Sequence, residues 1–326
     1  MKQDVRFKKK STGFESYELI HCALPEIYIG DVSTETAFLS KNISVPLMIS
    51  SMTGGYGKAT EINSQLAEVC RSEKIPLGVG SQRQMIENNR YLESYRVVRK
   101  TNPDGVIVGN IGAVQVVEIG DLSVFKRMVD LIEADAIAIH LNPLQEILQP
   151  GGKSQFKGVL KGIERIIEGM DIPVIVKEVG CGISEEVAQK LVNIGVAYID
   201  IAGAGGTSWA GIESYRVKKK YMAEQFWDWG IPTARSLEMV ACVKGARIIA
   251  SGGIEGGIDM AKALALGAEL CGAALPFLKV LADEGIDGLI SLLRLWQEEL
   301  KIAMFLTGSV QIQDLRREGV IEKESK

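Results

Sequence analysis

The sequence predicts an α/β protein of the (β/α)₈ TIM-barrel class, in which parallel strands close into a ring inside a layer of helices. The 326-residue length suits one such barrel, with an N-terminal extension and a C-terminal helix, as a single domain over residues 1–326. Short apolar runs alternate with helical patterns along the chain. Glycine is abundant, at 35 residues against 9 prolines, as expected where many strands turn tightly into helices.

The apolar runs are rich in Val, Ile and Ala and do not alternate with polar residues, which is typical of strands buried on both faces. We expect strands at 45–51, 75–80, 105–109, 136–141, 173–179, 197–202, 247–251 and 269–273. This repeated strand–helix rhythm favours a closed barrel. An open, doubly wound sheet stays possible, because a sequence does not show closure.

Helical patterns lie between these runs. We expect helices at 59–74, 122–133, 184–194 and 259–266, with Asp121 and Ser184 as N-caps of the second and third. A further helix at 281–306 lies beyond the last strand, where it would cap the barrel or contact another subunit. Two longer segments, 141–158 and 202–221, follow the fourth and sixth strands and would emerge on the face where barrels build active sites.

Composition restricts the class of function. The net charge is −4, and the lysine clusters at 8–10 and 218–220 are interpreted mainly as solvated surface, so nucleic acid is not an expected partner. No apolar run is long enough to span a membrane, and no signal peptide or CxxC pair is present. These features favour a cytoplasmic protein with a small-molecule ligand.

Small residues follow the last two predicted strands, where barrels commonly bind phosphate through backbone N–H groups. They are Gly252 and Gly253 after the seventh strand, and Ala273 and Ala274 at the end of the eighth. The glycine-rich loop after the sixth strand adds the Thr207 hydroxyl, and could equally be a flexible lid. After the first strand, a Gly-rich turn that includes Met52 and Thr53 could face the edge of a planar ring.

Polar side chains follow several other strands. Lys177 ends the fifth strand, where burying an unpaired amine would be costly, so it would serve an anionic ligand or pair with Glu178. His140 ends the fourth strand, with Asn142, Gln145 and Glu146 close behind it. Glu146 could ligate Mg²⁺, or it could simply face the N-terminus of a helix.

The second and third strands contribute further polar groups to the same face. Ser81 and Asn110 would point toward the barrel mouth. Arg83 could bind a phosphate through its guanidinium group, although a surface ion pair would account for it as well.

Taken in order, these motifs resemble the type 2 isopentenyl-diphosphate delta-isomerases over about residues 24–315. The most specific pieces are 52–55 (MTGG), 79–82 (VGSQ), 140–146 (HLNPLQE), 176–180 (VKEVG), 205–209 (GGTSW) and 251–253 (SGG). The resemblance implies an FMN barrel that requires Mg²⁺, is reduced by NADPH, and interconverts isopentenyl and dimethylallyl diphosphate. It also implies a homo-oligomer, either a tetramer or an octamer.

The resemblance also assigns roles to residues. It implies that FMN contacts Met52, Thr53, Ser81, Asn110, Lys177, Thr207, Gly252, Gly253, Ala273 and Ala274. It implies that Arg83, His140 and Asn142 face the substrate diphosphate, and that Glu146 holds Mg²⁺. Gln145 would lie beside the reacting carbons, so the catalytic candidates are Gln145, Lys177 and His140.

Two departures from the family pattern concern the diphosphate. The N-terminal Arg-Lys-x-x-His segment of the family has no counterpart here, although Arg6 and the lysines at 8–10 could supply charge. The chain also reads Pro150-Gly151-Gly152-Lys153 where the family tends to read Pro-Glu-Gly-Asp. Two alternatives therefore stay open: an FMN-dependent oxidoreductase acting on another phosphorylated or carboxylated substrate, and a non-catalytic FMN-binding paralogue.

Overall fold

The strands close into the predicted barrel. The computed structural model describes residues 4–87, 91–216 and 220–324, so Lys218, Lys219 and the first three residues lie outside it. Within these ranges the parallel strands form a closed barrel in the order β10-β11-β4-β5-β6-β7-β8-β9. Their bounds are β4 Leu47–Ile49, β5 Leu77–Gly78, β6 Ile107–Gly112, β7 Ala136–Leu141, β8 Val174–Glu178, β9 Tyr198–Asp200, β10 Ile248–Ser251 and β11 Leu270–Ala273. The closed barrel is thus confirmed and the open sheet is excluded.

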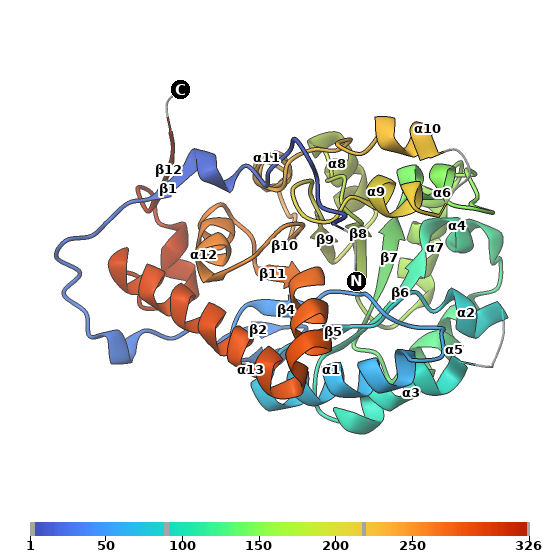
Figure 1. The fold of residues 1–326 in the computed structure, drawn as a ribbon, viewed down its shortest axis with the longest axis horizontal. Helices are drawn as coiled ribbons and strands as arrows, with labels where there is room; N and C mark the ends of the chain where they lie inside the picture. Colours follow the sequence, from blue (N-terminus) through green and yellow to red (C-terminus); the bar gives the residue numbers. More distant parts are fainter. Residues whose placement is uncertain (1–3, 88–90, 217–219, 325–326) are drawn as a thin grey trace.

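Helices surround the barrel (Figure 1). They are α1 Ala59–Glu73, α2 Arg83–Glu87, α3 Leu92–Thr101, α4 Ala113–Glu118, α5 Leu122–Ile132, α6 Pro143–Leu148, α7 Val159–Gly169, α8 Glu185–Asn193, α9 Trp209–Ser214, α10 Lys220–Gln225, α11 Thr233–Ala241, α12 Gly257–Ala265 and α13 Leu275–Leu306. Both predicted N-caps are confirmed. The Asp121 carboxylate accepts a bond from Ser123 N at 2.9 Å, and the Ser184 hydroxyl accepts one from Val187 N at 3.4 Å.

Shorter elements lie outside the barrel. An antiparallel pair joins β1 Tyr17–Leu19 to β12 Ile321–Lys323, and a hairpin joins β2 Thr36–Phe38 to β3 Lys41–Ile43. In the described ranges, 3₁₀ helices span Phe14–Ser16, Ile29–Asp31 and Ile312–Arg316. None of these short elements was predicted from the sequence.

Two large apolar clusters account for most of the core in the described residues. The larger lies between the strands and the helices, whereas the smaller of the two includes Met48, Val108 and Ile175 of the strands. Phe38 of the hairpin joins the smaller cluster and packs edge-on against Tyr198, with 5.0 Å between the ring centroids. The hairpin therefore covers one end of the barrel, and the opposite end is left for a ligand.

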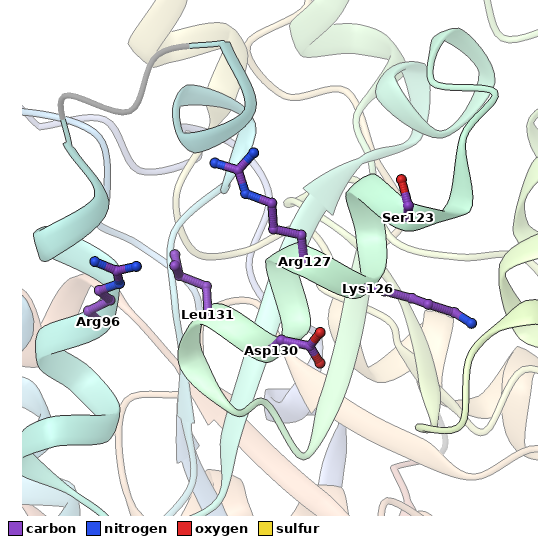
Figure 2. A pocket seen from close by; sticks show the side chains of 6 residues that line it. All are labelled: Arg96, Ser123, Lys126, Arg127, Asp130 and Leu131. Atoms are coloured by element: carbon purple, nitrogen blue, oxygen red, sulfur yellow. The ribbon is translucent and has the colours of Figure 1, made fainter.

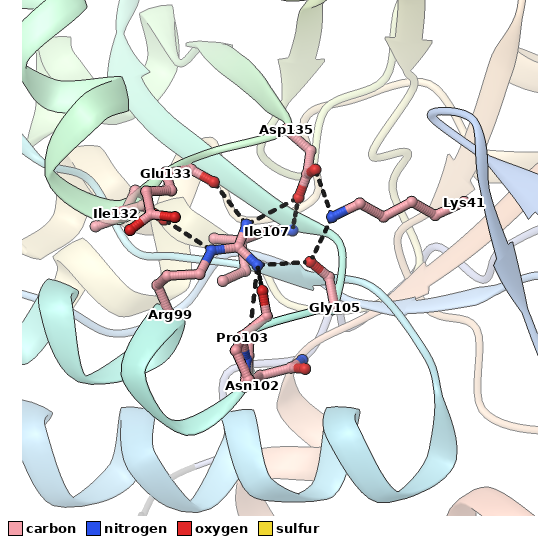
Figure 3. Close-up of polar contacts among 9 residues, drawn as sticks. All are labelled: Lys41, Arg99, Asn102, Pro103, Gly105, Ile107, Ile132, Glu133 and Asp135. Carbon is pink, nitrogen blue, oxygen red and sulfur yellow. Dashed lines mark hydrogen bonds and ion pairs between the residues drawn. The ribbon is translucent and has the colours of Figure 1, made fainter.

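Arg99 of α3 ties together the backbone at the N-terminal ends of β6 and β7 (Figure 3). Its guanidinium donates to five main-chain oxygens, which belong to Asn102, Pro103, Gly105, Ile132 and Glu133. It also bonds the Asp135 carboxylate at 3.0 Å, and Lys41 of the hairpin pairs with the same carboxylate at 2.6 Å. This network fastens the covered end of the barrel, away from the strand ends that carry the site.

Two predicted boundaries were wrong in ways that bear on the site. Strand β6 continues to Gly112, so Asn110 lies within the strand instead of following it. Helix α13 begins at Leu275, directly after β11, and is interrupted at Gly285, whose φ is 73°. Pro276 in its first turn is compatible with this early start, because that position needs no N–H donor. None of the helices in the described ranges is long and apolar enough to cross a membrane.

Candidate functional site

A cavity of about 530 Å³ opens at the C-terminal ends of the strands. The segment that follows β4 contributes Ser50 and Met52 to its lining, and β8 contributes Lys177. The remaining predicted cofactor residues that line it are Thr207, Gly252, Gly253, Ala273 and Ala274. The first turns of α9 and α13 close further sides through Trp209 and Pro276, among others. Its volume falls within the range of small-molecule and cofactor pockets.

The glycines of the β9 and β10 loops pack backbone against backbone beside this cavity. Gly252 has φ of 99°, and a Cβ there would overlap Gly203 O and lie 2.5 Å from Gly203 N. Gly253 has φ of 80°, and a Cβ there would lie 2.9 Å from Gly206 N. Only glycine combines this positive φ with so close an approach. Loop packing therefore requires glycine at both positions, while their contact with a phosphate stays a prediction.

Lys177 lies in the cavity wall beside a buried acid that the sequence analysis did not single out. Its register partner on β9 is Asp200, which is 2% exposed. Burial raises the pKa of the Asp200 carboxyl, and the Lys177 charge acts in the opposite direction. Ser251 Oγ donates to the same carboxylate at 2.6 Å. The Lys177 charge thus acts on this buried carboxyl, while its ammonium group donates at 2.6 Å to the main-chain oxygen of Glu178.

The predicted Lys177–Glu178 side-chain pair is not the one that forms. The buried Glu178 carboxylate instead accepts backbone bonds from Val179 N and Gly180 N, both at 2.7 Å, and from Cys181 N. Burial raises the pKa of Glu178 to about 7. Because Val179 and Gly180 line the cavity, this carboxylate fixes the loop that forms one of its walls.

His140 lies on β7, next to Lys177 in the strand register. Its Nδ1 is 3.0 Å from Asn110 Oδ1, so two predicted site residues meet directly. Burial lowers the pKa of His140 to about 3, and the charges of Lys177 and Arg83 act in the same direction. Arg83 is therefore close enough to act on the imidazole, which stays neutral near pH 7.

Asn142, Gln145 and Glu146 converge at the start of α6. Asn142 Nδ2 donates to Gln145 Oε1 at 3.0 Å and to Glu146 Oε1 at 3.3 Å. The Glu146 carboxylate is 5% exposed and also accepts from Lys153 N at 2.7 Å. The predicted trio is therefore brought together, and Glu146 is held by main chain and side chain.

Glu213 of α9 lies beside Gln145 and Glu146, and it was not among the site residues predicted from the sequence. Its side chain is fully buried and pairs with Arg216 at 2.9 Å, while its Oε2 has no hydrogen-bond partner. Burial raises its pKa, Gln145 lies near enough to lower it, and the Glu146 charge raises it further. An acidic residue inside a helix gives no sequence signal of this kind. The same helix lines the cavity through Trp209 and Ile212, so α9 connects the acidic cluster to the cavity.

Three predicted cofactor residues are not in the cavity lining. Thr53 is buried and its hydroxyl bonds Asn63, while the Asn110 amide oxygen meets His140. Ser81 accepts a bond from the Tyr95 hydroxyl through its main-chain oxygen. Their roles toward a cofactor therefore stay predictions.

A second depression, of about 420 Å³, lies on the outer surface between α3 and α5 (Figure 2). Arg96 comes from α3, and Ser123, Lys126, Arg127, Asp130 and Leu131 come from α5. None of the predicted site residues contributes to it. The barrel mouth is therefore the candidate site.

Comparison with known proteins indicates the family of this chain. Residues 149–322 match the family model described as FMN-dependent dehydrogenase. A protein of Methanothermobacter thermautotrophicus named isopentenyl-diphosphate delta-isomerase is 44% identical, over 98% of this chain and 89% of its own. One of the same name from Pyrococcus furiosus is 46% identical, over 95% of this chain and 81% of its own.

Solved structures support the fold. A mandelate oxidase variant carrying an FMN adduct aligns with a TM-score of 0.66 at 20% identity, covering 97% of this chain and 90% of that one. Mandelate oxidase with a difluorinated 2-hydroxy acid aligns with a TM-score of 0.67 at 21% identity, covering 96% and 88%. From its similarity to the named isomerases over nearly its whole length, and from the FMN-dependent family model, the chain belongs to the type 2 isopentenyl-diphosphate delta-isomerase family.

Proposed function

We propose that this protein interconverts isopentenyl and dimethylallyl diphosphate, using Mg²⁺ and FMN that NADPH has reduced. The observation that carries the proposal is the position of α9. Trp209 and Ile212 of this helix line the cavity, while Glu213 lies against Gln145 and Glu146. One short helix thus connects a cofactor-sized cavity to a cluster of amide and carboxylate groups.

The residues present fit FMN. The cavity has glycine-rich loops on one side and Lys177 in its wall. The Ser50 hydroxyl, which also lines the cavity, is buried without a hydrogen-bond partner, as expected of a group that a polar ligand would satisfy. Gly252, Gly253, Ala273 and Ala274 would hold the phosphate, and Met52 and Lys177 would contact the ring.

The diphosphate of the substrate would bind on the side of the barrel mouth near β7. Arg83 would supply charge there. Because Asn110 Oδ1 only accepts, the proton of the neutral His140 ring lies on Nδ1, so Nε2 would donate to the diphosphate only after the bound anion has led the ring to take up a second proton. Asn142 donates through Nδ2 to Gln145 and Glu146, and its buried Oδ1 has no partner, so this oxygen would accept a hydrogen bond from a donor and not bond a phosphate oxygen.

The oxygen donors near Glu146 fit Mg²⁺, which prefers carboxylate and phosphate oxygens. In the described part of the chain, no three His, Cys, Asp or Glu side chains converge on a possible metal position. Glu146 would therefore hold the ion together with diphosphate oxygens. This arrangement is common for Mg²⁺, which usually keeps few protein ligands.

Moving the double bond requires a proton to be added at one carbon and removed at another. The chemistry that reduced FMN supplies when bound is this proton donation and removal. Lys177, Trp209 and Ile212 line the cavity. The charge of Lys177 would favour an anionic ring, and the two apolar side chains would exclude water. Gln145, fixed between Asn142 and Glu213, would orient the reacting end of the substrate.

The β9 loop argues against oxidation of 2-hydroxy acids. Such barrels need a histidine base and an arginine clamp near this loop, and the chain has only two histidines, neither of them in 202–221. The similarity to mandelate oxidase extends to the fold alone.

Self-association is a further part of the proposal. The outer face of α13 exposes three large apolar side chains, Leu295, Ile302 and Leu306, at 54%, 42% and 41%. Such side chains are suited to a subunit contact. Light scattering on the purified protein would measure the tetramer or octamer that the family resemblance predicts.

The catalytic proposal is tested by reconstitution. The purified protein is examined for a bound-flavin absorbance spectrum, and then incubated anaerobically with reduced FMN, Mg²⁺ and isopentenyl diphosphate. We expect dimethylallyl diphosphate to form. Flavin binding without this product would contradict the isomerase proposal and leave an oxidoreductase or a non-catalytic FMN-binding protein.

A variant tests the role of the α6 residues. Gln145→Asn shortens the side chain by one methylene, which withdraws the amide from Asn142 and Glu213 while keeping its chemistry. We expect kcat to fall while the flavin spectrum stays unchanged. Unchanged turnover would show that Gln145 does not orient the substrate.

A further inference from the structure

The N-terminal segment lies across the loops that follow β9 and β10. Phe7 N donates to Gly206 O at 3.1 Å, and Ser208 N donates to Val5 O at 2.8 Å. These bonds form an isolated antiparallel bridge in which Arg6 pairs with Thr207. In Figure 1 the dark blue start of the chain runs beside the β8 and β9 labels, far in sequence from its partners.

A second contact fixes the backbone of Arg6 from the other side. The Trp227 indole donates to Arg6 O at 2.7 Å, and Lys8 lies over the same ring, 3.6 Å from its centroid. Further along the segment, Ala234 N donates to Thr12 O at 2.9 Å. The backbone around Arg6 is therefore held by the main chain of the loop after β9 and by the Trp227 indole, and further along, at Thr12, by the start of α11.

The Arg6 side chain faces the cavity. It lines the cavity together with Glu255, and the two side chains pair at 3.4 Å. Both are about half exposed, at 49% and 50%, so this ion pair is weak and easily exchanged. The other cations among the described lining residues are Lys177, which Asp200 compensates, and Lys279 on α13.

Arg6 lies at the end of the cavity that the glycine-rich loops after β9 and β10 form. Glu255 comes two residues after Gly253, and Gly206 packs so closely on Gly253 that a Cβ on Gly206 would lie 2.5 Å from Gly253 N. Phe7, the neighbour of Arg6, bonds that same Gly206. The guanidinium is thus adjacent to the loops proposed to hold a phosphate, and not to the His140 side of the barrel mouth.

We propose that Arg6 is a binding residue for the phosphate group of the flavin, exchanging its pair with Glu255 for a charge-assisted bond to the phosphate. This inference rests on the proposed FMN site. Without a cation here, the Glu255 carboxylate would repel the phosphate dianion. Arg6 removes that repulsion and presents a planar fork that suits phosphate oxygens.

The test compares FMN with riboflavin, which has the same ring and ribityl chain but no phosphate. Apoprotein is titrated with each flavin, and binding is followed by flavin fluorescence. Arg6→Met is expected to weaken FMN binding about tenfold, as for the loss of one charge-assisted bond, and to change riboflavin binding by less than about twofold. Arg6→Lys keeps the charge but not the fork and is expected to weaken FMN binding less.

Two further variants sharpen the comparison. Adding Glu255→Gln to Arg6→Met removes the repulsion, so part of the lost FMN affinity is expected to return. Lys9→Met is the matched control, because Lys9 belongs to the same segment but does not line the cavity, and its affinity for both flavins is expected to stay unchanged.

Three results would overturn the inference alone. They are equal weakening of FMN and riboflavin by Arg6→Met, no weakening of either, and unaltered FMN affinity with a raised KM for the substrate, which would assign Arg6 to the diphosphate. A wild-type protein that binds neither flavin would instead overturn the proposed function, and this inference with it.

Discussion

The close packing of Gly252 against Gly203 makes a quantitative prediction about stability and cofactor binding. In Gly252→Ala, the new Cβ would overlap Gly203 O and lie 2.5 Å from Gly203 N, so one of two backbone segments must move. The φ of 99° also places an L-residue in unfavourable space, at a cost of about 1–2 kcal/mol. Overpacking adds about 1–3 kcal/mol, so we expect a total loss of about 2–5 kcal/mol.

Gly158 provides a matched control. Its φ is 94°, but a Cβ there would have nothing within 4 Å. Gly158→Ala is therefore expected to lose only the conformational part, about 1–2 kcal/mol. The difference between the two variants isolates the packing of the β9 loop on the β10 loop.

The assay is equilibrium unfolding in guanidinium chloride, followed by the fluorescence of the four tryptophans, together with FMN titration of each variant. Because the loop shift would displace the proposed phosphate site, we expect Gly252→Ala to weaken FMN binding by about tenfold or more, and Gly158→Ala to leave it unchanged. Equal destabilisation by the two substitutions, with equal FMN affinity, would refute the reasoning.

Three further predictions concern single side chains. The pKa of His140 is lowered from 6.5 to about 3, so between these pH values the unfolded state binds a proton that the folded state does not, and this group makes stability rise with pH. The unliganded His21→Gln variant has one histidine left, and its NMR spectrum should show no titration of His140 above pH 5. A titration near pH 6.5 would contradict this prediction. Glu146→Gln should raise the Mg²⁺ concentration needed for half-maximal turnover, and an unaltered Mg²⁺ titration would exclude Glu146 as a ligand. Arg99→Ala leaves the partly buried Asp135 with one fewer cation and leaves five main-chain oxygens without this donor, so unfolding free energy should fall by about 3–5 kcal/mol while FMN affinity stays unchanged. A loss below about 1 kcal/mol by chemical denaturation would be inconsistent with this network.

The barrel strands could be predicted because a parallel strand buried on both faces leaves a simple mark, a short unbroken apolar run. Lys177 was recognisable for the same reason, since a charge at the end of such a run needs a partner. Asp200 breaks an equivalent run in Ile199-Asp200-Ile201, so the same signal was present there and was not used. It marks the partner of Lys177.

Other parts of the site depend on contacts between distant residues, which a local pattern does not encode. Glu213 reads as an ordinary helical acid until α9 is packed on α6. Arg6 reads as one more N-terminal charge until its backbone pairs with Thr207. The early start of α13 was missed because residues 275–280 follow β11 almost directly, with no turn segment between strand and helix to mark a helix start, and these first turns line the cavity.

In the proposed reaction, this barrel uses flavin for an isomerisation without net redox change. The most direct measurement is the ratio of product to reductant. The protein is reduced once, anaerobically, with a limiting amount of NADPH, and supplied with excess isopentenyl diphosphate and Mg²⁺. We predict many molecules of dimethylallyl diphosphate for each NADPH oxidised, with the flavin still reduced at the end. One equivalent of NADPH consumed per product, or no product from the reduced protein, would contradict the claim.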